Sequence, residues 1–265
     1  MKRGLLFILG LALIAFSCEK VIDLPLNNAD QQIVVEAALF DIQDSSFVKL
    51  SRTADVYNDS GFDKISGASV IVTDNFGNTY NFTEDPQTPG LYLDTTFVAQ
   101  PYMQYDLFVI AEGDTVTATS QTFADIAFDS LDYQYQPGGF GNTDSTYFVF
   151  FNFSDNAADE NYYRAVPIIN GAQSTTQYIT DDKLFNGNNY RQPFFAEQIY
   201  PGDTLVALII SMDEANYKYL YSLSSNSGGG PFSPTPANPV SNLGGKALGY
   251  FGVFMTGYEQ IIFPQ

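Results

Sequence analysis

The sequence predicts an all-β protein with two β-sandwich domains, the second of which carries one short helix and a long loop rich in Gly and Pro. Apolar and polar residues alternate in short runs along most of the chain, as they do in half-buried strands. These runs are rich in Val, Ile, Thr, Tyr and Phe and are separated by Gly, Pro, Asn and Asp. Hydrophobic residues make up 45% of the 265 residues and charged residues 15%, a balance typical of a folded protein. The length allows one large domain or two small ones.

The first segment, residues 1–17, has the composition of an export signal. Two basic residues near the start precede an apolar run over residues 4–16, which is too short for a stable bilayer crossing. Cys18, the only cysteine, directly follows this signal. This position predicts a bacterial lipoprotein in which the Cys18 thiol is acylated and becomes the first mature residue. The alternative is an ordinary signal peptide followed by a chance cysteine.

Residues 18–32 follow the predicted lipid and include Pro25, Asn27, Asn28 and Asp30, a composition that suits a tether. The first domain is expected over residues 33–122 as an immunoglobulin-like or transthyretin-like sandwich. Two tight turns are predicted, at residues 75–78 and 112–114, where Gly77 and Gly113 can adopt a positive φ. The expected strands are residues 33–40, 47–52, 68–74, 79–83, 95–99, 105–111 and 115–122.

The second domain is expected over residues 123–265, with a boundary that depends on strand count alone. One helix is predicted over residues 214–223, capped by Asp213 and with Tyr217, Leu220 and Tyr221 on one face. Residues 224–239 are too rich in Ser, Gly, Asn and Pro to be regular. The expected strands are residues 126–136, 146–153, 162–169, 175–179, 194–200, 205–211, 248–255 and 259–263.

The composition excludes several kinds of chemistry. There is no His, so neither a Ser-His-Asp triad nor an imidazole base can form, and zinc sites lose their commonest ligand. A single cysteine excludes an internal disulfide. Lys and Arg number 11 against 30 Asp and Glu, for a net charge of −19. This charge opposes binding to DNA or RNA, so we expect no nucleic-acid partner.

Two stretches carry a family resemblance. Residues 66–72 (SGASVIV), Asp74, Gly77 and residues 89–92 (PGLY) resemble the carboxypeptidase-regulatory or transthyretin-like sandwich. This motif has a small residue where the strand begins, a glycine in the turn and a Pro-Gly corner before an aromatic strand. Each residue type suits its position in such a sandwich.

The second resemblance spans nearly the whole mature chain. Its signature is MDEANYKYL, NPVSNLGG and LGYFG at residues 212–220, 238–245 and 248–252, with CEKVIDL at residues 18–24. These segments resemble an uncharacterised Bacteroidetes lipoprotein family, the domain of unknown function 4249 family. Lys246 and Ala247 separate the glycine pair at residues 244–245 from Leu248, and this spacing is wider than the family's. The resemblance implies an accessory role beside a TonB-dependent outer-membrane receptor and carries over no catalytic residue.

Candidate binding residues come from acidic and aromatic positions. Asp155, Asp159 and Glu160 lie in one predicted loop and offer oxygen ligands for Ca²⁺, although such a loop is also compatible with a solvated turn. No other cofactor is expected. Tyr219 falls off the predicted apolar face of the helix, so we expect it to be exposed and able to contact a partner or ligand. Phe232 is an apolar side chain within the long polar loop, where it can dock on a partner or tuck under its own domain.

These observations favour a non-enzymatic outer-membrane lipoprotein that assists a TonB-dependent transporter or binds its ligand. The cell surface is favoured over the periplasmic face, because Glu19 directly follows Cys18, although Lys20 and Val21 interrupt an acidic export tag. The alternatives are a carboxylate-based or calcium-dependent glycan-active surface enzyme and a structural adhesin.

Overall fold

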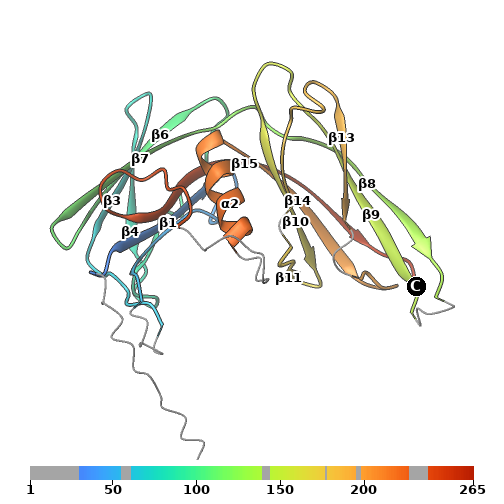
Figure 1. Ribbon diagram of the computed structural model, residues 1–265, viewed down its shortest axis with the longest axis horizontal. Coiled ribbons are helices and arrows are strands. Elements are labelled where there is room, and N and C mark those ends of the chain that lie inside the picture. The colour runs from blue at the N-terminus through green and yellow to red at the C-terminus, as the bar shows by residue number, and fades with distance from the viewer. Residues whose placement is uncertain (1–29, 55–60, 139–143, 177, 195–197, 227–237) are drawn as a thin grey trace, which may run out of the picture.

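The computed structural model describes residues 30–54, 61–138, 144–176, 178–194, 198–226 and 238–265. Within these ranges the chain forms β-strands and one helix, α2 (Glu214–Asn226) (Figure 1). The all-β prediction is therefore confirmed. No helix among the residues described has both the length and the apolar character needed to span a membrane.

The strands form two sheets. A three-stranded sheet has the order β13-β9-β8, and the path through the larger sheet is β11-β10-β14-β15-β1-β2-β5-β4-β3-β6-β7, with β12 paired to β10. The small sheet contains β8 (Ala127–Gln136), β9 (Thr146–Ser154) and β13 (Asn189–Phe194). The larger sheet contains β1 (Ile33–Phe40), β2 (Phe47–Arg52), β3 (Ser69–Asp74), β4 (Thr79–Glu84), β5 (Leu91–Leu93), β6 (Gln104–Ala111), β7 (Asp114–Gln121), β10 (Tyr162–Ile169), β11 (Ala172–Gln173), β12 (Tyr178–Asp181), β14 (Thr204–Met212) and β15 (Leu248–Ile262).

Of the three clusters of buried residues in the described part of the chain, two lie between layers of strands and the third lies under α2. In the first, side chains of β1, β2 and the first half of β15 pack against those of β3, β6 and β7. In the second, side chains of β9 pack against those of β10 and β14. Figure 1 shows these two groups of strands on opposite sides of α2, with β15 running from one to the other.

The last strand, β15, contributes to both cores. It pairs in parallel with β1, from Val34 opposite Leu248 to Phe40 opposite Phe254. Its residues Phe251, Val253 and Met255 belong to the first core, whereas Ile261 packs on the second. The two predicted domains are thus joined by a common strand, and the boundary between residues 122 and 123 stays a prediction.

Both turns predicted in the first half are present. Gly77 has φ +87° and Gly113 has φ +90°, in the left-handed region that glycine adopts at little cost. The Asp74 carboxylate accepts hydrogen bonds from the backbone N–H groups of Phe76 (3.0 Å) and Asn78 (2.9 Å). The residue types therefore determine the hairpin between β3 and β4 locally.

The predicted strand at residues 95–99 is wrong, and the paired strand is β5, immediately before it. Phe97 and Ala99 are buried, which gives the segment the alternation of a strand. However, the Asp94 carboxylate accepts hydrogen bonds from both the backbone N–H (2.9 Å) and the hydroxyl (2.7 Å) of Thr96. This turn bends the chain away from the sheet, so burial alternates without strand pairing.

Apart from shifts of one residue, five other predicted elements differ from the structure. The strands expected at residues 248–255 and 259–263 form the single strand β15, because residues 256–262 continue to pair with β14. The strand expected at residues 194–200 lies earlier, as β13, and the one expected at 175–179 lies later, as β12. The helix extends three residues beyond Leu223, to Asn226.

The hydrogen bonds of Glu84 predict that the stability of the first sandwich depends on pH. The Glu84 carboxylate accepts hydrogen bonds from the backbone N–H groups of Gly90 and Gly67, both at 2.9 Å. The bond from Gly90, with further bonds from Ser66 and Gly67, lowers the pKa of Glu84 below its usual 4.5. A depressed pKa means that the ionised form contributes stability above the unfolded-state pKa, and this stability is lost as pH falls through the folded-state pKa.

We expect Glu84→Gln to flatten the loss of stability between about pH 5 and pH 3, since the ordinary pKa of a Glu carboxyl lies within this range. Urea unfolding of both proteins across this range measures the effect. Glu259→Gln is the control, since Glu259 is exposed near the end of β15 and should leave the wild-type pH profile in place. A Glu84→Gln profile that runs parallel to that of the wild type would contradict this account.

Candidate functional site

The signature residues at the start of α2 form a buried polar network. The Asp213 Oδ1 atom accepts hydrogen bonds from the backbone N–H and the side-chain amide of Asn216, both at 2.8 Å. Its Oδ2 atom accepts from the Ser120 hydroxyl at 2.7 Å and from the Gln121 N–H at 3.2 Å. The predicted helix cap is confirmed, and the same carboxylate connects α2 to β7.

This network continues into β15. The Asn216 amide donates to the carbonyl of Phe251 at 3.0 Å, and the Val253 N–H donates to the Ser120 hydroxyl at 3.1 Å. An added Cβ at Gly252 would lie 2.7 Å from Asn216 Oδ1 and 2.1 Å from the Phe254 ring. Only a residue without a side chain fits between the helix and the ring, which explains the glycine at this position of the signature.

The signature segment before β15 is held by side chains that act as backbone partners. The Asn242 amide donates to the Phe251 carbonyl at 2.7 Å, and its oxygen accepts from the Phe251 N–H at 3.0 Å. The Ser241 hydroxyl donates to the carbonyl of Gly249 at 2.7 Å. Since every one of these contacts is internal, these signature residues fix the path of the chain and place the nearby pockets.

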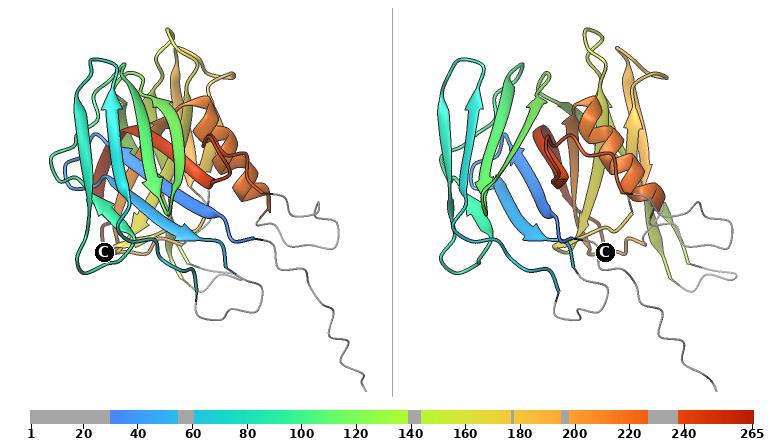
Figure 2. Two further views of the ribbon diagram at one scale, coloured as in Figure 1. Left: turned by 90° about the vertical axis from the view of Figure 1, so that its left-hand side faces the viewer. Right: turned by 60° about the vertical axis from the view of Figure 1, so that its left-hand side comes forward.

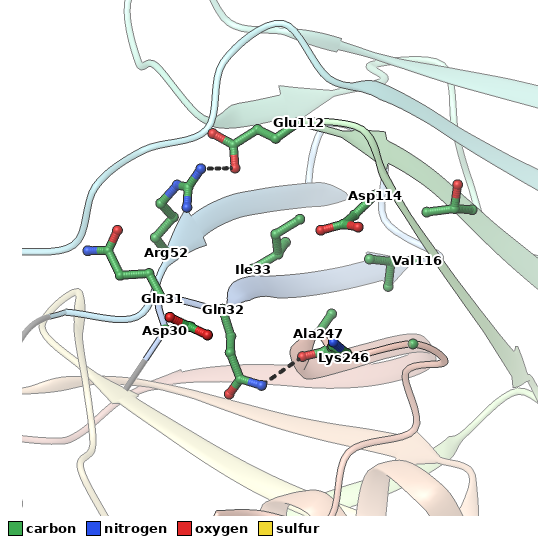
Figure 3. A pocket seen from close by; sticks show the side chains of 12 residues that line it. Asp30, Gln31, Gln32, Ile33, Arg52, Glu112, Asp114, Val116, Lys246 and Ala247 are labelled. Atoms are coloured by element: carbon green, nitrogen blue, oxygen red, sulfur yellow. Dashed lines mark hydrogen bonds and ion pairs between the residues drawn. The ribbon is translucent and has the colours of Figure 1, made fainter. Parts of the chain in front are cut away.

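A pocket of about 730 Å³ lies where the described chain begins, and we call it the tether pocket (Figure 3). Its lining comes from four segments that are distant in sequence: the residues before and at the start of β1, the end of β2, the β6–β7 turn with the start of β7, and the loop before β15. The lining residues are Asp30, Gln31, Gln32, Ile33, Arg52, Glu112, Asp114, Thr115, Val116, Gly245, Lys246 and Ala247.

The tether pocket has charged walls of both signs. Arg52 forms an ion pair with Glu112 at 2.5 Å, and the Gln32 side-chain amide donates to the carbonyl of Lys246 at 3.2 Å. Figure 3 shows both contacts at the rim of one hollow. The Gln32 carbonyl also accepts a hydrogen bond from the backbone N–H of Thr53 at 3.0 Å. The last residues of the predicted tether are therefore part of the folded body.

Tyr219 lies beside a second, smaller pocket of about 150 Å³, whose lining includes Glu36, Pro239 and Gly249. The expectation that Tyr219 is exposed was wrong. Its ring packs on that of Tyr250 with centroids 4.9 Å apart, and burial, followed by the nearby Glu36, raises its pKa. Tyr221, expected on the buried face, is 56% exposed, because α2 covers the sheet with Tyr217 and Leu220. The binding role of Tyr219 stays a prediction.

The three carboxylates proposed for calcium are not grouped as metal ligands. Asp155 accepts hydrogen bonds from the Tyr163 hydroxyl at 2.6 Å and from the Gly187 N–H at 2.7 Å. Asp159 accepts from the Asn156 amide at 3.2 Å, and Glu160 is exposed. Across the described ranges, no three Cys, Asp or Glu side chains come together in a way that could hold a metal ion. The acidic loop is built instead from turn-forming hydrogen bonds.

Two other predicted site residues, Cys18 and Phe232, lie outside the described residues. Sequence reasoning did not single out the residues of the tether pocket, because they converge only through the β1–β15 pairing and the β6–β7 turn. It also missed Arg164, a cation within the strand at residues 162–169. A basic residue in a strand that is otherwise almost entirely apolar was the available signal.

Comparison with known proteins gives a match to a family model and a distant likeness to a solved structure. The family model described as a domain of unknown function (DUF4249) matches residues 19–259. No curated protein matches the chain. A solved pullulanase from Anoxybacillus sp. LM18-11, in complex with maltotriose, is 12% identical over 67% of the chain and 24% of the pullulanase chain, with a TM-score of 0.22. That score is too low to support an argument about function, and the chain spans about a quarter of the pullulanase's length.

Proposed function

The chain belongs to the DUF4249 family, and on this premise we propose that it is an outer-membrane lipoprotein that binds a TonB-dependent transporter or its ligand without catalysing a reaction. The observation that carries the proposal is the position of Cys18, the only cysteine, directly after an apolar export signal. The family resemblance supports a Bacteroidetes-type cell and a transporter as the partner.

The position of the tether pocket supports a role close to the membrane. At about 3.5 Å per residue, the segment from Cys18 to Asp30 can reach at most roughly 40 Å. A pocket lined by Asp30 therefore stays near the lipid if Cys18 is acylated. Anchoring confines the protein to two dimensions and raises its effective concentration at a receptor in the same membrane. Weak contacts from the pocket rims are then sufficient for a stable complex.

We expect Cys18→Ser to abolish incorporation of labelled palmitate and to move the protein from the membrane fraction to the soluble fraction. Stable anchoring requires at least two lipid signals, and this change removes the thiol that starts the acylation. Ser17→Ala is the matched control, because it keeps a small residue before the intact thiol. Equal labelling of Cys18→Ser and wild type would contradict lipidation at this residue.

Purification of the tagged, full-length protein in mild detergent tests the partnership. We expect a TonB-dependent receptor to co-purify with the wild type. No receptor across several detergents and growth conditions would count against the proposal. Bound calcium in the purified sample would favour the glycan-active enzyme, and self-association on a sizing column would favour the adhesin.

A further inference from the structure

A third cavity, which we call the sheet groove, lies on the face of the large sheet beside α2 and has a volume of about 260 Å³. Its floor comes from β10, β14, β15, β1 and β2, and Leu220 of α2 forms one wall. Figure 1 shows α2 in front of β15, between the two groups of strands. The groove is lined by Ala38, Phe40, Phe47, Arg164, Val166, Ile168, Gln173, Leu208, Ile210, Met212, Leu220, Tyr250 and Phe254.

The lining of the sheet groove is almost entirely aliphatic and aromatic. Phe40 and Phe254 face each other with ring centroids 5.4 Å apart. Phe40, Leu208 and Ile168 remain only partly buried. Apolar side chains at the floor of a concave surface favour an apolar ligand, because binding removes their surface from water.

Arg164 is the one charged residue in this lining. Its side chain is partly buried, and desolvation lowers its pKa, with Tyr250 acting in the opposite direction. The five ion pairs among the described residues involve other cations, and no hydrogen bond to the Arg164 side chain is found there. The Glu36 carboxylate, which acts on Tyr250, is paired with Lys49 at 2.9 Å. A desolvated guanidinium without a carboxylate partner is costly and favours an anionic ligand.

We propose that the sheet groove binds a free aliphatic carboxylate, with the alkyl chain on Leu208, Ile210 and Phe254 and the carboxylate against the Arg164 guanidinium. The site combines an apolar channel with a single cation, which is the complement of this ligand. This inference depends on neither the lipid anchor nor the transporter.

A peptide suits the sheet groove less well than an alkyl chain. The backbone groups of β10, β14, β15 and β1 are engaged with neighbouring strands over the length of the groove. A peptide in the groove would therefore leave N–H and C=O groups without partners, at a cost for each buried group. An alkyl chain has no such groups, and its single polar end meets Arg164.

Photolabelling of the purified full-length protein tests this site. The probe is a decanoate that carries a diazirine on its chain, and mass spectrometry maps the labelled peptides. We expect labels on β10, β14 and β15, competed by unlabelled decanoate. Decanol, which lacks the charge, should compete about tenfold or more less well, since a charge-assisted hydrogen bond is lost.

Two variants separate the charge from the apolar channel. Arg164→Met should weaken competition by decanoate about tenfold to a hundredfold and leave competition by decanol unchanged. Arg191→Met is the matched control, because Arg191 lies on β13 with its guanidinium 3.7 Å from the Phe150 ring. Leu208→Trp keeps the cation but fills the channel, so it should lose labelling altogether.

The proposal is overturned if decanoate competes equally well in Arg164→Met and wild type, or if labels are spread over strands that do not line the groove. If Arg164→Met fails to fold, the mapped labels on the wild type and the loss in Leu208→Trp still decide the question. Retained labelling in folded Leu208→Trp contradicts the site. Neither result bears on co-purification of a receptor, so the two proposals fail separately.

Discussion

Replacing Gly249 with alanine is expected to lower the free energy of unfolding by roughly 2–6 kcal/mol. Gly249 has φ +108°, and holding a residue with a side chain in this left-handed conformation costs about 1–3 kcal/mol. An added Cβ would also lie 2.0 Å from the carbonyl oxygen of Val35, its pairing partner on β1. Forcing these strands apart costs about 1–3 kcal/mol more.

Gly77→Ala is the matched control for this change. Gly77 has a similar φ of +87°, but no atom lies within 4 Å of an added Cβ. The control should therefore show the conformational cost alone, about 1–3 kcal/mol. Urea unfolding of the full-length proteins measures both variants, with an unchanged m-value as evidence that two-state behaviour is kept. Equal losses in the two variants would mean that the β1–β15 contact is not tight.

The second large effect is expected at Asp213. Asp213→Ala removes the cap of α2, which costs about 1 kcal/mol. It also leaves the buried Ser120 hydroxyl and the Gln121 N–H without their acceptor, at about 1–3 kcal/mol for each group that remains unpaired. We expect a total loss of about 3 kcal/mol or more in urea unfolding.

Glu214→Ala provides the comparison, since it changes the adjacent acid. Glu214 is exposed and forms an i,i+4 ion pair with Lys218 at 2.8 Å, a type of contact that contributes only about 0.3–0.5 kcal/mol. If the two variants lose equal stability, Asp213 acts only as a surface charge near the helix end. Circular dichroism separates loss of α2 from loss of the strands.

The strands that were predicted well are those whose alternation and turn residues are local. The hairpin from β3 to β4 was readable because Asp74 and Gly77 determine it within a few residues. Phe97 misled the prediction, because its burial comes from a chain segment that crosses the core without joining the sheet. The β1–β15 pairing could not be predicted, since strands so distant in sequence carry no local signal of their register.

The candidate site was less predictable than the fold. Tyr219 was expected to be exposed because helix periodicity identifies the apolar face of α2. Periodicity does not show how far the neighbouring strands extend around the helix beyond that face. Tyr250, on the strand that follows the long loop after α2, packs on the Tyr219 ring. The tether pocket could not be predicted, because four separate segments converge to form it. The role of Arg164 could not be predicted either, because it depends on which carboxylates lie near it in the fold. These features arise only in the tertiary structure, so no single segment of the sequence predicts them.

The position of β15 has a consequence for how the molecule matures. Its partner β1 is among the first residues of the body to be synthesised, whereas β15 is among the last, so the centre of the large sheet stays open until synthesis is nearly complete. Contacts between such distant residues slow folding. The pairing of β15 with both β1 and β14 therefore completes the large sheet late and joins its two halves in the last step of folding.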